Sequence, residues 1–345
     1  MVSERGLQVL RAIVQDYVET REPVGSKTIV ERHAFGVSAA TIRNDMAQLE
    51  DEELIAAPHT SSGRVPTDKG YRVFVDHLSQ LRPLSPAQRA AISTFLEGAT
   101  DLDDVLARTV RALTTLTGQV AIVQYPSFAQ ANVSHVELVA LEGGRMLVIL
   151  VTDTGRVSQR MLQARADLDA DELTRLRGRV ASLVTGRSVR LGAQAVADEA
   201  AGLDLDASRD DVLAFPVLRV VAEELEEFRQ DRLVMAGTAN LARREQDFRS
   251  SIYPLLEAIE EQVTLLRLMS EMVADDKGLS VSIGRENEQF GLTEASVLTG
   301  DYDPATHARV GVLGPLRMDY ATNLAAVRTV AHYVSRLLED DEQTR

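Results

Sequence analysis

Residues 22–72 constrain the fold more than any other stretch, because they combine two short helical patterns, a tight turn and a basic hairpin pattern. Ser26 is expected to cap a first helix over residues 27–33, since its hydroxyl can accept a hydrogen bond from a first-turn amide. Gly36 then supplies the permissive backbone that a sharp turn between two helices needs. The pattern predicts a helix-turn-helix at the N-terminal end of the chain.

The second helix, expected over residues 39–53 with Ser38 as its cap, carries the functional argument. At about 100° per residue, one side is apolar and is expected to pack inward: Ile42, Met46 and Leu49. The opposite side carries small residues, amides and a hydroxyl, with a guanidinium at its flank: Ala40, Thr41, Asn44, Ala47, Gln48 and Arg43. Small residues let a helix enter a major groove, while Asn and Gln pair with adenine and Arg with guanine. A solvated polar face is the alternative, but the helix-turn-helix context favours DNA recognition.

A hairpin pattern follows and is expected to form the wing of a winged helix-turn-helix, with Thr67 capping the helix after it. Arg64 lies where a wing would present a cation to phosphate or to the minor groove. His59, in the polar loop 58–63, and Lys69 are expected near phosphate as well. His59 could also be a metal ligand, but no Cys and no second His stand at ligand spacing, so the phosphate role is favoured.

The charge of the chain restricts how it can bind DNA. The net charge is −15, but residues 1–82 hold 10 Lys and Arg against 12 Asp and Glu, so most of the excess negative charge lies in residues 83–345. A basic domain is a common footprint of nucleic-acid binding, and this chain lacks one. Binding is therefore expected to rely on base contacts and on dimerisation rather than on non-specific attraction.

Four blocks of the sequence carry a family resemblance: Ser3–Tyr17, Glu22–Lys27, Ser38–Met46 and His59–Arg72. With a looser match at residues 237–241, they resemble the HrcA family of heat-inducible transcription repressors. The resemblance implies a DNA-binding repressor of chaperone genes that recognises an inverted-repeat operator called CIRCE. It also implies that the chaperonin GroEL keeps the repressor active. Its implied architecture is a GAF-like domain interrupted by a dimerising insert.

The order of helical and strand patterns predicts an α+β chain of several domains. A linker with two prolines covers residues 79–88. Strand patterns occupy two regions on either side of a mainly helical block, which predicts one sheet domain with an insertion: residues 119–125, 133–141, 145–152, 156–162, 279–283, 295–299 and 310–313. The patterns predict a winged helix at 1–80, a discontinuous α/β sheet domain at 81–185 and 276–345, and a mainly helical insert at 186–275. The resemblance implies that the sheet domain is GAF-like and that the insert is the dimerisation domain.

One apolar stripe leaves two interpretations open. Positions between Leu255 and Val273 recur at helical spacing, with glutamates on the other side. Such a stripe is usually ordinary core. The alternative is a dimer face, because a two-fold operator requires a two-fold protein. A homodimer is predicted in either case.

No pattern of enzyme chemistry is present. The chain has no Cys, and it lacks the P-loop, GxSxG, HExxH and dinucleotide-binding motifs, so no catalytic residue, metal site or cofactor is predicted. It also lacks a signal peptide and a run long enough to span a bilayer, which favours a cytoplasmic protein without membrane contact. The second functional hypothesis keeps the DNA-binding domain but makes the GAF-like domain a sensor of a small ligand.

Overall fold

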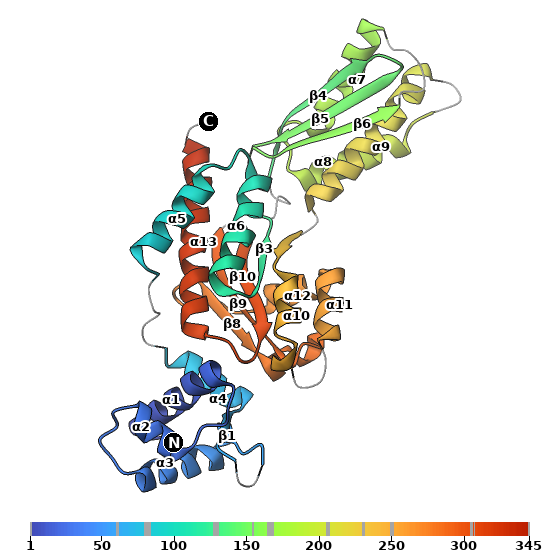
Figure 1. The fold of residues 1–345 in the computed structure, drawn as a ribbon. Helices are drawn as coiled ribbons and strands as arrows, with labels where there is room; N and C mark the ends of the chain where they lie inside the picture. Colours follow the sequence, from blue (N-terminus) through green and yellow to red (C-terminus); the bar gives the residue numbers. More distant parts are fainter. Residues whose placement is uncertain are drawn as a thin grey trace. The chain divides into compact units, whose positions relative to one another are not determined.

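The computed structural model describes two compact units. The described residues are 2–59, 62–78, 84–126, 131–153, 155–163, 169–204, 208–229, 232–248, 252–303, 306 and 308–343. Unit 1 consists of Met1–Gln124, Leu233–Pro304 and Arg309–Asp340, and unit 2 is mainly Tyr125–Arg232 (Figure 1). No described helix combines the length and the apolar character that crossing a membrane requires.

The N-terminal helical cluster, residues 2–78, contains four helices and a hairpin. These are α1 (Glu4–Thr20), α2 (Ser26–Arg32), α3 (Ala39–Asp51), β1 (Ile55–Ala56), β2 (Val65–Pro66) and α4 (Asp68–Asp76). The strands pair antiparallel, with Ile55 opposite Pro66. One apolar residue or more from each of α1, α2, α3 and β1 is fully buried in the cluster core: Leu10, Ile13, Ile29, Ile42, Leu49 and Ile55. The predicted inward stripe of the second helix is confirmed.

Capping residues set most of the helix starts in this cluster. The hydroxyls of Ser38 and Thr67 accept hydrogen bonds from amides in the first turns of α3 and α4, as predicted. Gly36 adopts a φ of 67°, which confirms the turn between α2 and α3. The predicted cap at Ser26 is wrong: extended Gly25 is the N-cap, without a side-chain bond, and Ser26 is the first helical residue.

Unit 1 also contains a five-stranded sheet with the strand order β7-β3-β10-β9-β8. Its strands are β3 (Val120–Gln124), β7 (Leu233–Ala236), β8 (Leu279–Ile283), β9 (Ala295–Asp303) and β10 (Ala308–Pro315). β3 pairs antiparallel with both β10 and β7. Strand β7 was not predicted, because four apolar residues between helical stretches carry no periodicity and their partner strand lies far away in the sequence.

Helices cover both faces of this sheet. On one face, α10 (Thr238–Arg243), α11 (Tyr253–Glu261) and α12 (Val263–Glu271) share a buried cluster with Val120, Val297 and Leu313. On the other face lies α13 (Tyr320–Gln343). Its Val327 and Ala331 side chains pack so close to Gly300 of β9 that a Cβ added at this glycine would contact both. Figure 1 shows α5 (Pro86–Glu97) and α6 (Leu102–Thr117) beside α13. Two short 3-10 helices, η1 (Glu245–Asp247) and η2 (Gly284–Phe290), complete this part.

The apolar stripe over residues 255–273 belongs mainly to the core of unit 1. Gln262, with a φ of 54°, interrupts the expected single helix and separates α11 from α12. Within the stripe, Leu255, Ile259 and Met269 are buried and Leu266 is partly buried, whereas Val263 and Val273 are 62% and 87% exposed. The structure therefore favours the core interpretation of this stripe.

Unit 2 is an antiparallel meander covered by three helices. It contains β4 (Val133–Leu141), β5 (Arg145–Thr152), β6 (Val157–Gln163), α7 (Ala170–Val184), α8 (Val189–Ala201) and α9 (Arg209–Arg229). Gly143 and Gly144 both have positive φ and form the turn between β4 and β5. Strand β5 is the central strand of the three.

The prediction that all strands form one sheet was wrong. Strands β4, β5 and β6 form a separate sheet in unit 2, which covers residues 125–232. These strands pair only with their sequence neighbours, so nothing in their pattern shows which sheet they join. The units thus differ in extent from the expected domains: residues 125–185 lie with unit 2, and 233–275 lie with unit 1.

Candidate nucleic-acid interface

The outer face of α3 is polar, exposed and free of internal partners. Ala40, Arg43, Asn44, Ala47 and Gln48 are exposed, whereas the apolar stripe behind them is buried. Within the described part of the chain, the side chains of Arg43, Asn44 and Gln48 make no hydrogen bond or ion pair. Their donors and acceptors are therefore available to base edges, as the periodicity predicted.

The start of α3 uses two of the predicted site residues for capping. The Ser38 hydroxyl accepts a hydrogen bond from the Thr41 amide at 3.2 Å, and the two hydroxyls lie 3.0 Å apart. Both side chains remain at the surface. A phosphate at this helix start would meet first-turn amides and the positive end of the helix dipole.

A buried carboxylate that the sequence analysis missed fixes α3 against α1. Asp45 is 4% exposed and accepts hydrogen bonds from Nε and Nη2 of Arg5 at 2.8 and 3.0 Å. The hydrogen bond to Asp45 raises the pKa of Arg5, and the charge of the carboxylate adds to the shift. A signal was present, since Asp45 lies on the apolar side of the helix beside Ile42 and Met46, where an unpaired charge would be costly.

Two predicted cations are engaged inside the protein. Nε of Arg64 donates to Glu50 at 2.9 Å, and its Nη1 donates to the Ser62 carbonyl at 3.1 Å. Nζ of Lys69 donates to the Glu52 carbonyl at 2.8 Å, beyond the end of α3. Arg64 therefore braces the hairpin against α3 instead of projecting freely.

Two further positive or titratable side chains remain at the surface of the cluster. His59 is exposed in the hairpin loop, and its amide donates to the Ser62 hydroxyl at 3.0 Å. Residues 60 and 61 of that loop lie outside the described residues. Lys27, in the first turn of α2, is exposed and has no ion-pair partner among the described side chains. It was not among the predicted site residues.

Within unit 1, α4 carries contacts from the cluster to the sheet. Nε of Arg72 donates to Glu286 at 2.7 Å, and its Nη2 donates to the Val281 carbonyl at 2.7 Å. Burial lowers the pKa of Arg72, but the hydrogen bond and charge of Glu286 outweigh it, so the pKa stands above its ordinary value. Tyr71 packs against Tyr320, with ring centroids 5.6 Å apart. These contacts support the base of the cluster and leave the outer face of α3 open.

Metal chemistry has no candidate in the part of the chain that the structure describes. No group of three or more His, Asp or Glu side chains there is arranged to hold a metal ion. The six His of the chain were expected to be scattered, and His59 stands apart from any ligand set.

Comparison with known proteins decides the family. The model of the HrcA protein C terminal domain matches residues 103–323. The chain belongs to the HrcA family. The "Heat-inducible transcription repressor HrcA" of Clavibacter michiganensis subsp. michiganensis is 62% identical over 343 residues, covering 99% of this chain and 100% of that protein. The relative of the same name from Leifsonia xyli subsp. xyli is 58% identical, with 99% and 100% covered.

These relatives are named as transcription repressors, so the HrcA family is one of regulators and not of enzymes. A solved structure described as a hypothetical protein at 2.2 Å resolution aligns with a TM-score of 0.67 and 24% identity, covering 99% of both chains. That likeness supports the mixed helix and sheet fold of several domains.

Proposed function

We propose that the chain represses transcription by binding an inverted-repeat operator of the CIRCE type as a homodimer. The N-terminal helical cluster acts as a winged helix-turn-helix, with α3 in the major groove. The observation that carries the proposal is the exposed set Arg43, Asn44 and Gln48, whose side chains have no partner among the described residues and lie opposite a buried stripe. The names of the relatives support the same function, since each is a heat-inducible transcription repressor.

The chemistry of α3 suits base recognition. Asn44 and Gln48 are one helical turn apart, and each amide can pair bidentately with adenine. Arg43 can pair bidentately with guanine, and the small residues Ala40 and Ala47 allow the helix to approach the bases closely. Ser38 and Thr41 lie at the start of α3, and Lys27 and His59 are exposed elsewhere on the cluster. These side chains can contact phosphates, which position the helix without reading sequence.

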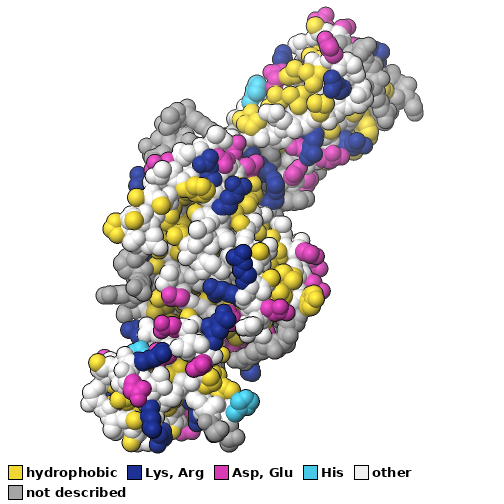
Figure 2. Space-filling view, in the orientation of Figure 1, with side chains coloured by type: hydrophobic (Ala, Val, Ile, Leu, Met, Phe, Trp, Pro, Cys, Tyr) yellow, Lys and Arg dark blue, Asp and Glu magenta, His cyan; other side chains and the backbone are white. Residues whose placement is uncertain are grey.

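Dimerisation is supported by the uncovered face of the sheet in unit 2. A solvent face of an antiparallel sheet is normally polar. Here Val139, Leu147 and Met161 are cross-strand partners in one row, and Val157 and Met161 are 53% and 55% exposed. Figure 2 shows hydrophobic side chains gathered over this part of unit 2. A contiguous apolar patch marks an interface, and a second copy of the chain is the occupant that a two-fold operator demands.

The proposed regulation acts through folding. The relatives are named as heat-inducible, and the HrcA resemblance implies dependence on the chaperonin GroEL. Because folded proteins are only marginally stable, the amount of available chaperonin can determine the fraction of the repressor that is folded and active. Heat stress would occupy the chaperonin, lower the active repressor and release the chaperone genes.

The test measures operator binding by the full-length protein after dilution from denaturant, using fluorescence anisotropy. An inverted-repeat duplex is compared with a scrambled duplex of equal length, each with GroEL and ATP, with ATP alone, and with neither. The proposal expects a higher active fraction with chaperonin, and binding that prefers the inverted repeat by about 10³-fold or more. Equal affinity for both duplexes would overturn operator recognition. An identical, high active fraction with and without chaperonin would overturn chaperonin dependence.

Ligand sensing by a GAF-like domain remains the second candidate function. One observation favours it, a cationic groove on the sheet part of unit 1. The same operator measurement separates the ligand-sensing regulator from the chaperonin-dependent repressor, because a ligand sensor should change its affinity for DNA when a small anion is added.

A further inference from the structure

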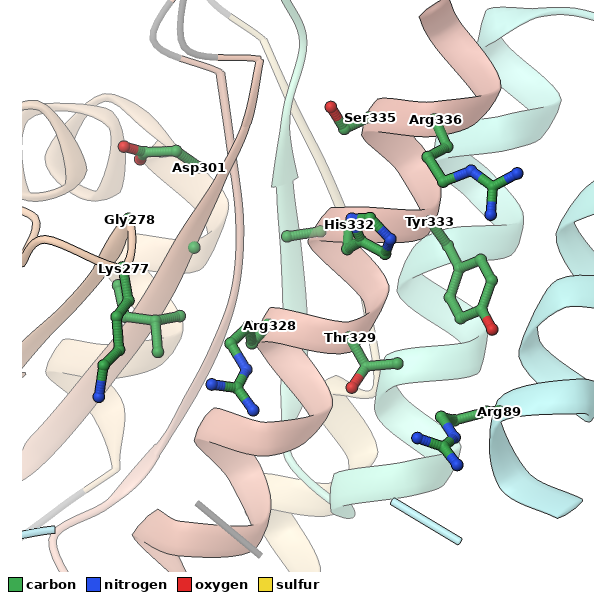
Figure 3. Close-up of a pocket in the computed structure, with 13 residues that line it drawn as sticks. Arg89, Lys277, Gly278, Asp301, Arg328, Thr329, His332, Tyr333, Ser335 and Arg336 are labelled. Carbon is green, nitrogen blue, oxygen red and sulfur yellow. The ribbon is translucent and has the colours of Figure 1, made fainter. Parts of the chain in front are cut away.

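A groove on unit 1, away from α3, has the size of a small-molecule site. Its volume is about 700 Å³, and residues of α5, α13, β9 and the segment around the start of β8 line it (Figure 3). Ligand sites in proteins typically measure roughly 300–1,000 Å³. The lining contains positively charged side chains, hydroxyl groups and the phenol ring of Tyr333.

The groove carries an excess of positive charge in a chain with a net charge of −15. Arg89, Lys277, Arg328 and Arg336 line it, and all four are exposed. None of these four side chains forms an ion pair or hydrogen bond within the described residues. The one carboxylate of the lining, Asp301, already accepts a hydrogen bond from Arg309 at 2.9 Å, so it does not neutralise them.

The cations are placed around the exposed side of α13. Arg328, His332 and Arg336 follow one another at intervals of four residues, so they lie along one side of the helix. Figure 3 shows Arg336 and Arg89 on either side of the Tyr333 ring, on the α5 side of α13. Arg328 extends toward Lys277 on the opposite side. Two cation pairs therefore flank the helix, one of them beside an aromatic ring.

A merely solvated basic face explains this arrangement poorly. Four cations around one groove, unpaired within the described residues, raise the local positive potential, which attracts an anion. Guanidinium groups match the geometry of phosphate oxygens and form charge-assisted pairs of hydrogen bonds with them. The Tyr333 ring offers an aromatic face at the same groove, whereas the hydroxyls of Thr329 and Ser335 already donate to the Ala325 carbonyl and to Glu339.

We propose that this groove binds a small phosphate-bearing anion of the nucleotide class. The phosphates pair with the arginines and Lys277, and the ring of the ligand stacks on Tyr333. This site is separate from the α3 face, and the proposal does not depend on operator binding. A bound polyphosphate without a ring shares the phosphate chemistry, so the test has an arm for each.

The test titrates the metal-free full-length protein with sodium pyrophosphate and, separately, with ATP, using isothermal titration calorimetry. The variant Arg328→Gln/Arg336→Gln removes two cations, and Arg267→Gln, an exposed arginine of α12 outside the groove, is the matched control. The wild type should bind both probes. The double variant should raise the Kd about a hundredfold, because it loses two charge-assisted contacts that are each worth roughly a factor of ten. The control should leave the Kd unchanged.

Two further variants make the result specific. Tyr333→Leu should weaken ATP several-fold and leave pyrophosphate unchanged, since only ATP has a ring to stack. Arg328→Lys/Arg336→Lys keeps the charge and should recover part of the affinity, which a folding defect would not allow. The proposal is overturned if the wild type binds neither probe, or if the double variant binds both as tightly as the control does.

Discussion

The outer face of α3 and the surface of unit 2 use arginine in opposite ways. In unit 2, Arg177 donates to Glu137 at 3.0 Å, Arg209 to Glu172 at 2.8 Å, and Arg179 to both Glu199 and Asp211. On α3, Arg43 has no carboxylate partner in the described structure. An arginine that is already paired must give up its carboxylate before it can bind phosphate or a base, whereas Arg43 has only water to release. An arginine paired with a carboxylate is thus suited to a structural role, and one without such a partner is suited to binding, even when both lie at the surface.

The largest effect that this comparison predicts concerns specific DNA binding. Arg43→Ala/Asn44→Ala should weaken operator binding by ~2–6 kcal/mol per half-site, since each base-reading side chain contributes ~1–3 kcal/mol. Arg177→Ala is the matched control, because it removes a paired arginine from unit 2. Anisotropy titrations of the full-length proteins measure both. If the double variant and Arg177→Ala bind the operator with equal affinity, the proposed difference between free and paired arginines is wrong.

The second prediction uses the apolar sheet face of unit 2. Met161→Asp places a charge at the centre of the proposed dimer surface and should weaken the dimer by ~2–4 kcal/mol, because a buried unpaired charge is costly. Leu191→Asp, on α8, is the control, since Leu191 and Met161 are 53% and 55% exposed. Sedimentation at several protein concentrations measures the dissociation constant of the dimer. Equal dissociation of the two variants would place the interface elsewhere.

The two regions also show what the sequence could reveal. The polar side of α3, its cap Ser38 and the strand limits 133–141 and 145–152 follow from local spacing, and the structure has each of them. Such features depend on residues a few positions apart, so a single sequence carries them. The free face of the candidate site was therefore predictable.

What the sequence could not reveal depends on distant pairing. Strand β7 exists because β3, more than a hundred residues earlier, offers it an edge. Arg64 was expected to be a free cation, but the fold brings Glu50 to its guanidinium. Likewise, the separation of the sheet of unit 2 from that of unit 1 follows from tertiary packing and not from strand pattern. Charge and exposure could be predicted, but the choice of partner could not.

A third prediction sharpens the contrast between paired and free cations inside the N-terminal cluster. Lys27→Ala removes an unpaired cation and should lower the slope of log affinity against log salt by about 1. Arg64→Ala removes a cation held by Glu50 and Ser62, so it should leave the slope unchanged and lower the stability of the cluster by ~1 kcal/mol. Salt titrations and thermal unfolding measure the two effects. A flattened slope in Arg64→Ala would show that this arginine leaves Glu50 to contact phosphate.

The smallest expected effect concerns the paired arginines of unit 2, whose contribution to stability should depend on pH. Hydrogen bonds from Arg177, Arg209 and Arg179 lower the pKa of Glu137, Glu172 and Asp211 below their ordinary values. A carboxylate whose pKa is lower in the folded state stabilises the fold fully above its unfolded pKa, about 4, and loses this contribution as the pH falls through the folded value. Below pH 4 the hydrogen-exchange protection factors of the amides of β4, α7 and α9, which correct for the slower intrinsic exchange at low pH, should therefore fall.

The triple variant Glu137→Gln/Glu172→Gln/Asp211→Asn removes the titrating groups that cause this dependence. The hydrogen-exchange protection factors of its unit 2 should change less between pH 5 and pH 3 than those of the wild type, with a difference that shrinks in high salt because these pairs face solvent. The neutral variant should be slightly less stable at pH 7 and equal to the wild type near pH 3. If both proteins show the same pH dependence, the arginine pairs of unit 2 do not stabilise it, and pairing alone would no longer distinguish its arginines from Arg43.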